Sequence, residues 1–105
     1  MNKARRKILA TVAKRMSEIM EEIEEVKALT DELSNLRDEI DTARDEEQDA
    51  FDNLSEGVQA GDRGQAMESA ISQMEEASSA IDDMINALDD IDVQSIIDAL
   101  EGAAE

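Results

Sequence analysis

Apolar residues follow a heptad pattern along the first half of the chain. From Leu9 to Val26 they recur at alternating steps of three and four residues, which is the spacing of a coiled-coil helix. The step from Val26 to Leu29 is three where four is due, and the pattern then resumes as far as Leu54. The spacing therefore predicts one long helix over residues 3–56, with a change of phase after Val26.

A second heptad pattern follows after two glycines. Gly57 predicts the end of the first helix, because glycine readily adopts the left-handed conformation that often ends helices. Asp62 and Gln65 have the spacing of an N-cap and its capping box, so they predict the start of the next helix. The sequence thus predicts a turn over residues 57–62 and a second helix over residues 63–91.

The last apolar residues predict a short third helix over residues 93–101, with Asp92 as its N-cap and Gly102 at its end. In an antiparallel hairpin, facing residues have a constant sum of residue numbers. A sum of 120 or 121 places apolar residues opposite apolar residues along the whole length, as with Ile40 and Ile81. The same register places the change of phase in the first helix opposite the break near Asp92.

The predicted fold class is therefore all-α, with a single domain over residues 1–105. It is a long antiparallel helical hairpin, similar to a coiled coil, with a short third C-terminal helix. Because such a hairpin has a thin core, we expect it to dimerise into a four-helix bundle. A parallel dimer along the first helix is the alternative, since Glu32 and Glu39 are spaced to pair with Arg37 and Arg44 of a second copy.

The composition restricts the chemistry that the chain can perform. Among its 105 residues there is no His, Cys, Pro, Trp or Tyr, and Phe51 is the single aromatic residue. The lack of His and Cys excludes imidazole catalysis, thiolate nucleophiles and the usual zinc sites. Solvated carboxylates are poor acid–base catalysts at neutral pH. We therefore expect no enzymatic activity and no cofactor.

We also expect no metal site. Five side chains near the C-terminus do approach the spacing of a calcium-binding loop; they are Asp90, Asp92, Gln94, Asp98 and Glu101. Ser95, however, stands where that loop requires glycine. A break between two helices explains the same residues.

Positive charge is concentrated at the N-terminus, although the formal net charge is −18. Residues 1–17 carry +6, and the remaining 88 residues carry four basic and 28 acidic side chains. The basic N-terminal patch consists of Lys3, Arg5, Arg6, Lys7, Lys14 and Arg15. Three interpretations stay open. The patch balances acidic residues of its own or a neighbouring subunit, anchors the chain on anionic lipid or nucleic acid with Ile8, Leu9, Val12 and Met16 as the apolar side, or belongs to a cleavable targeting peptide.

Acidic pairs recur every seven residues in both predicted helices. The members of these acidic rows are Asp31, Glu32, Asp38, Glu39, Asp45, Glu46, Glu75, Glu76, Asp82, Asp83, Asp89 and Asp90. Seven residues are nearly two helical turns, so each row follows one side of its helix in steps of about 10 Å. A solvated outer face and adaptation to high salt are two explanations. Such faces usually mix both signs of charge, however, and no basic residue follows Arg63.

A basic partner surface is the third explanation of the acidic rows. Regular negative charge resembles the phosphate rows of a nucleic acid, and would attract a nucleic-acid-binding protein. We therefore expect a cytoplasmic, non-enzymatic binding protein, in its sharper form an inhibitor that mimics nucleic acid. The alternative is a structural or scaffolding coiled-coil protein. Direct contact with nucleic acid or membrane is expected only through the basic N-terminal patch.

Overall fold

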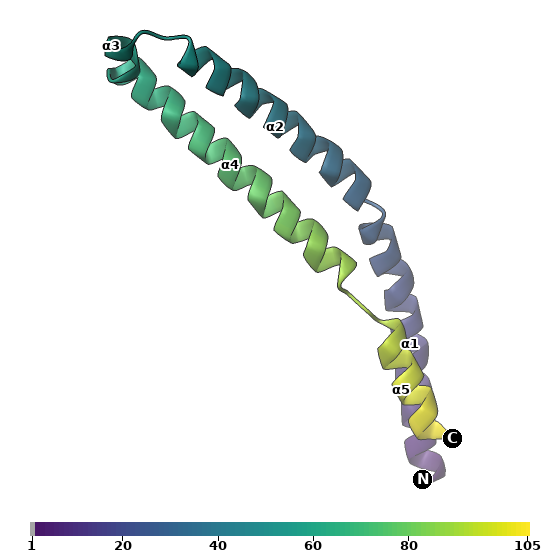
Figure 1. Ribbon diagram of the computed structural model, residues 1–105. Helices are drawn as coiled ribbons and strands as arrows, with labels where there is room; N and C mark the ends of the chain where they lie inside the picture. The colour runs from purple at the N-terminus through teal and green to yellow at the C-terminus, as the bar shows by residue number, and fades with distance from the viewer. Residues whose placement is uncertain (1) are drawn as a thin grey trace. The chain divides into compact units, whose positions relative to one another are not determined.

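The computed structural model describes residues 2–105, and all regular structure in that range is α-helical. The helices are α1 (Lys3–Lys27), α2 (Thr30–Asp52), α3 (Glu56–Gln59), α4 (Asp62–Asp89) and α5 (Gln94–Ala104) (Figure 1). They form two compact units. Unit 1 contains Met1–Leu29 and Ala87–Glu105, and unit 2 contains Thr30–Asn86.

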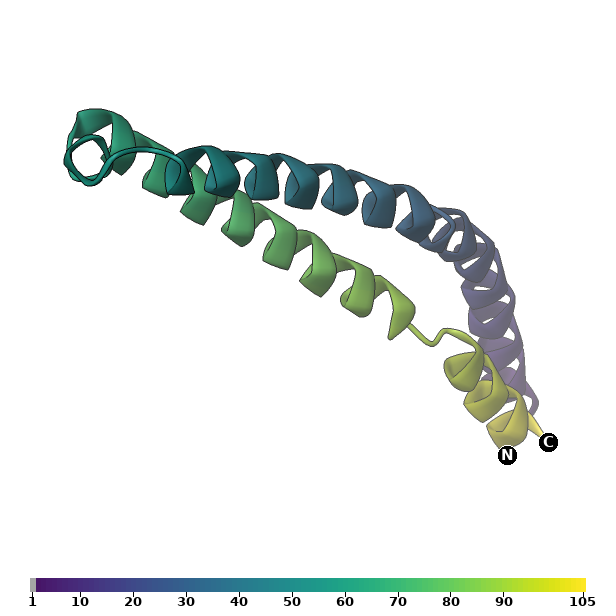
Figure 2. The same cartoon turned by 45° about the horizontal axis from the view of Figure 1, so that its top comes forward.

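Unit 2 is an antiparallel helical hairpin. Its helices α2 and α4 lie side by side in both views and are joined through α3 (Figures 1 and 2). Leu33 and Ile40 of α2 are half-buried, as are Met74 and Ile81 of α4, while Ile71 is 7% exposed. The sequence places these apolar residues one or two turns apart, so each helix covers the other with a single stripe.

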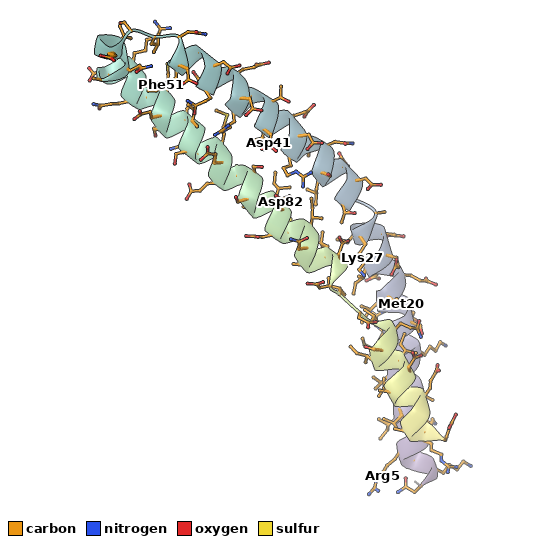
Figure 3. All side chains as sticks on the ribbon, viewed as in Figure 1. Arg5, Met20, Lys27, Asp41, Phe51 and Asp82 are labelled. Atoms are coloured by element: carbon orange, nitrogen blue, oxygen red, sulfur yellow. The ribbon has the colours of Figure 1, made fainter. Side chains whose placement is uncertain are left out.

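The turn of unit 2 is compact. Phe51 lies at the turn end of α2, where its backbone carbonyl accepts a 2.9 Å hydrogen bond from the Gln59 side chain (Figure 3). Gly64 is buried against the same residue, and a Cβ atom there would lie 1.9 Å from the Gln59 carbonyl oxygen. A side chain at position 64 is therefore incompatible with this turn.

The details of the predicted turn are wrong in three respects. The helix ends at Asp52 rather than at residue 56, and Gly57 lies inside the short helix α3. No residue in the described range 2–105 has a positive φ, so Gly57 is not a left-handed cap. Asp62 is the first residue of α4, and the Gln65 side chain donates to the Ala60 carbonyl (3.3 Å) in place of a capping box. An extra helical turn provides the reversal that left-handed glycine was expected to provide.

Unit 1 packs the short helix α5 against α1. Its core consists of Ala13 from α1 with Val93 and Ile97 from the C-terminal segment, which are 8%, 7% and 4% exposed. The Asn2 side chain caps α1 by accepting a 2.9 Å hydrogen bond from the backbone N–H of Arg5. Together, the two units confirm the predicted all-helical, antiparallel hairpin class with a short C-terminal helix.

The single helix predicted over residues 3–56 is instead two helices, α1 and α2. The break falls at Ala28 and Leu29, where the apolar spacing changes from four to three. At the break, the Leu29 N–H donates to the Val26 carbonyl, three residues earlier instead of the four of an α-helix, at 3.0 Å. The Lys27 ammonium donates to the Ile91 carbonyl at 2.6 Å, so this break lies beside the break that precedes α5. That neighbourhood agrees with the predicted register.

The C-terminal helix is longer than predicted. It spans Gln94–Ala104 rather than residues 93–101, and Gly102 lies within it. The Asp92 carboxylate accepts a 3.1 Å hydrogen bond from the Ser95 N–H, which satisfies one of the free N–H groups of the first turn. The N-cap residue of α5 is nevertheless Val93 and not Asp92 as predicted, so Asp92 contributes a capping hydrogen bond from one position earlier.

Candidate interaction surfaces

One edge of unit 2 is closed by polar contacts between α2 and α4. Arg44 donates to one oxygen of Glu75 from both Nη2 (2.7 Å) and Nε (3.0 Å), and Arg37 donates to Asp82. Between them, the Ser78 hydroxyl donates to Asp41 at 2.7 Å. In all three pairs the residue numbers add up to 119. A constant sum is the signature of an antiparallel register, and it lies close to the predicted one.

These contacts stabilise the charged form of both arginines. Hydrogen bonds to Asp82 and then Asp38 raise the pKa of Arg37 above its ordinary value. Bonds to Glu75 and then Asp45 raise the pKa of Arg44 in the same way. Within this chain, both arginines therefore serve the hairpin. The parallel dimer that would use them between subunits stays an untested alternative.

The acidic rows divide into two groups. Asp82 and Glu75 form ion pairs between the helices, and Asp38 and Asp45 contact the arginines that immediately precede them, at 3.3 and 2.9 Å. Eight other members are exposed and form no ion pair within residues 2–105; these are Asp31, Glu32, Glu39, Glu46, Glu76, Asp83, Asp89 and Asp90. The acidic residues available to a partner are therefore fewer than the sequence pattern suggests.

The opposite edge of unit 2 is apolar and uncovered. Some apolar residues of the heptad pattern, such as Leu33 and Ile81, face the other helix and are half-buried. Leu36 and Met84 belong to the same pattern but are 45% and 46% exposed. With small exposed neighbours they form a group that we call the apolar strip: Leu36, Ala43, Ala50, Ala77, Ala80 and Met84. On each helix, the half-buried apolar residues lie between the apolar strip and the residues that form the arginine contacts. Because those contacts share one edge of the helix pair, the apolar strip follows the opposite edge on both helices.

The basic N-terminal patch lies on the first turns of α1. Arg15 pairs with Glu18 at 2.8 Å, whereas the other five basic residues form no ion pair within the described range 2–105. Arg5 lies near the start of α1 in Figure 3. The helix has two apolar sides here. Leu9 and Ala13 face α5, while Ile8 and Val12 are 61% and 42% exposed.

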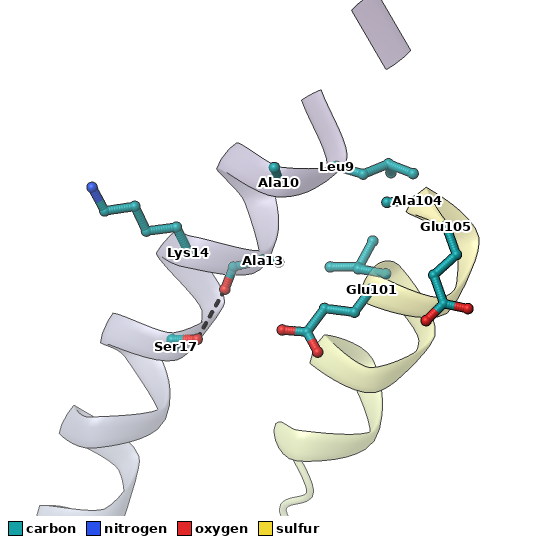
Figure 4. A pocket seen from close by; sticks show the side chains of 9 residues that line it. Leu9, Ala10, Ala13, Lys14, Ser17, Glu101, Ala104 and Glu105 are labelled. Atoms are coloured by element: carbon teal, nitrogen blue, oxygen red, sulfur yellow. Dashed lines mark hydrogen bonds between the residues drawn. The ribbon is translucent and has the colours of Figure 1, made fainter. Parts of the chain in front are cut away.

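A hollow lies between α1 and α5 in unit 1. Its walls include Leu9, Ala13, Leu100, Glu101 and Ala104, and Leu9 reaches across to Ala104 (Figure 4). One polar contact in this region, the 3.1 Å hydrogen bond from the Ser17 hydroxyl to the Ala13 carbonyl, stays within α1. The lining is mostly apolar.

The calcium-like spacing near the C-terminus does not form a loop. Gln94 begins α5, and its side chain donates to Asp98 at 2.9 Å within that helix. Within the described part of the chain, no group of three or more acidic side chains is arranged to hold a metal ion. Nor does any helix among residues 2–105 have a stretch long and apolar enough to cross a membrane.

Sequence patterns did not identify the most specific structural residues. Gly64 carries no periodic signal, and its only clue is that a glycine stands within a helical pattern. Asp41 and Ser78 lie outside the acidic rows, and the only sequence signal that relates them is the constant sum of residue numbers. The chain matches no protein family model, and no curated protein or solved structure is significantly similar to it.

Proposed function

We propose that this chain is a non-enzymatic binding protein whose acidic surface binds a basic surface on another protein. The observation that carries the proposal is the exposed, unpaired state of acidic residues placed seven apart, such as Glu39 with Glu46 and Glu76 with Asp83. Unit 2 contains three arginines and seventeen acidic residues. Two of those arginines are already engaged by acidic residues of the hairpin.

The sharper form of this proposal is an inhibitor that mimics nucleic acid. Steps of about 10 Å along a rigid helix present negative charge at regular intervals. A protein that binds nucleic acid carries lysine and arginine side chains placed for rows of phosphates, and such a surface would accept these rows. Electrostatic attraction would raise the association rate and make the affinity fall as salt rises.

The test neutralises four exposed acidic residues and measures binding. A pull-down with the full chain at low and high salt, read by mass spectrometry, first identifies basic partners. Binding of the recovered partner is then measured for a surface variant that carries Glu39→Gln, Glu46→Gln, Glu76→Gln and Asp83→Asn. We expect its affinity at low salt to fall on the order of ten-fold or more, because the lost charges face the partner.

A matched control separates the surface from the total charge. Glu21, Glu22, Glu24 and Glu25 are also exposed, and changing them to glutamine removes the same four charges from α1. We expect this control variant to keep most of the affinity. Equal losses in the two variants, or full binding by the surface variant with helical circular dichroism intact, would show that the acidic rows of unit 2 are not the binding surface.

The apolar strip favours a second candidate, a scaffolding protein that assembles through its uncovered edge. Leu36 and Met84 are too exposed to contribute fully to the hairpin's own core. A scaffold would lose its biological partner interactions when these two residues become glutamine, whereas a mimic of nucleic acid would keep them. The pair of variants therefore distinguishes the two functions in one binding assay.

A further inference from the structure

Two exposed apolar surfaces are not explained by the hairpin. One is the apolar strip of unit 2. The other lies on α1, where Ala4, Ile8 and Val12 follow one another at steps of four residues and line a shallow hollow with Lys7 and Thr11. Ile8 is 61% exposed, the most of any large apolar side chain in the described range 2–105. We call Ala4, Ile8 and Val12 the N-terminal apolar row.

The charges that border these two surfaces are opposite. On α2, Glu39 and Glu46 lie one helical turn from members of the strip, and on α4, Glu76 and Asp83 lie one turn before and after Ala80. All four are exposed and unpaired within residues 2–105. The apolar strip is thus bordered by acidic residues on both sides.

The N-terminal apolar row is bordered by basic residues instead. Arg5 lies three residues before Ile8, Lys7 lines the same hollow, and Arg15 lies three residues after Val12. The lengths also match. From Leu36 to Ala50 the strip extends about 21 Å along α2, and residues 4–15 of α1 extend about 17 Å.

We propose that the N-terminal segment of α1 from one copy binds the apolar strip of a second copy. Apolar residues would then cover apolar residues, and the bordering basic side chains would meet the bordering acidic ones. A symmetric contact of strip on strip is disfavoured, because it would bring Glu39, Glu46, Glu76 and Asp83 against the same acidic residues of the partner. The proposal concerns the purified chain alone, so it does not depend on the proposed function.

The first experiment measures self-association of the full chain by sedimentation at increasing protein concentration. At low salt we expect the average mass to rise with concentration. At about 1 M salt, where charges are screened within about 3 Å, we expect self-association to weaken at least ten-fold. A mass equal to the monomer at every concentration would overturn the proposal.

The second experiment separates the two surfaces. A row variant carries Ile8→Gln and Val12→Gln, and a strip variant carries Leu36→Gln and Met84→Gln. Each alone should self-associate at least ten-fold more weakly, since each lacks one of the two surfaces in contact. Mixed together they should form a complex, because the row variant keeps an intact strip and the strip variant keeps an intact row. Val26→Gln is the control, as Val26 is 44% exposed on the same helix and lies outside the row.

The outcomes that oppose the proposal are specific. A row variant that associates normally while the strip variant does not would indicate a strip-on-strip contact. Failure of the two folded variants to form a complex when mixed would also overturn it. If the row variant loses binding only to vesicles containing anionic lipid, and self-association is unchanged, the N-terminal row binds membrane and not a second copy.

Discussion

Units 1 and 2 are both antiparallel helix pairs, but different interactions stabilise them. Unit 1 buries Ala13, Val93 and Ile97 between α1 and the C-terminal segment. Unit 2 buries Ile71 and Gly64, and its helices are joined by ion pairs along one edge. One heptad-like sequence can therefore produce a small apolar core in one region and a polar junction in another. The second arrangement leaves an apolar edge uncovered.

The largest expected effect is the loss of the Ile97 side chain, which is the most buried large residue within the described range 2–105. Ile97→Ala should destabilise unit 1 by about 2–4 kcal/mol, because it removes buried methyl groups and leaves a cavity. The change should appear in chemical denaturation and as faster hydrogen exchange in α5. Exchange in α4 near Ile71 should change less.

Ile96→Ala is the matched control for this prediction. Ile96 is the same residue type in the same helix, but it is 47% exposed. We expect a loss of less than about 1 kcal/mol, since little apolar surface is taken from the core. Equal effects at positions 96 and 97 would mean that α5 does not pack against α1 through Ile97.

The next largest effect is expected at the turn of unit 2. Gly64→Ala places a Cβ atom 1.9 Å from the Gln59 carbonyl oxygen, so the backbone of the turn must move. We expect a loss of about 1–3 kcal/mol. The control is Gly57→Ala, because nothing lies within 4 Å of a Cβ atom at that position in α3. Alanine there should be neutral or stabilise by up to about 1 kcal/mol. Similar thermal melting of the two variants would show that α3 does not pack closely on α4.

Much of the fold was predictable from the sequence, because the heptad spacing carries the necessary information. A constant sum of residue numbers aligned the two helices, and the observed polar contacts have nearly the same sum. The change of phase after Val26 also marked the true break at Ala28 and Leu29. What spacing alone did not show is that this change of phase ends the helix.

The side of each helix that faces its partner could not be predicted in the same way. A heptad pattern marks an apolar stripe on each helix. In unit 2, however, the side of α2 that faces α4 lies between the middle of that stripe and the two arginines. Leu33 and Ile40 are therefore half-buried while Leu36 is exposed. This rotation brings together ion pairs such as Arg44 with Glu75, which depend on geometry between helices that no single-helix pattern contains.

For the candidate interaction surface, the sequence showed where acidic residues are concentrated but not which of them are paired within the hairpin. The spacing of the acidic rows did not distinguish Asp82, which pairs with Arg37, from Asp83, which is exposed and unpaired within residues 2–105. Adjacent acidic residues point to different sides of a helix, and only the position of the neighbouring helix decides which of them meets a basic side chain.

The smallest expected effect concerns the polar edge of unit 2. Arg44→Met keeps most of the side-chain length but removes both hydrogen bonds to Glu75. Arg63→Met removes the same charge, and Arg63 forms no ion pair within residues 2–105. We expect Arg44→Met to lower the melting temperature at low salt by a few degrees and by more than Arg63→Met does, with the difference shrinking as salt rises. Because exposed ion pairs contribute little, this effect should be smaller than those at Ile97 and Gly64.

Identical melting of the two arginine variants at every salt concentration would show that total charge, and not the Arg44 contact, stabilises this edge.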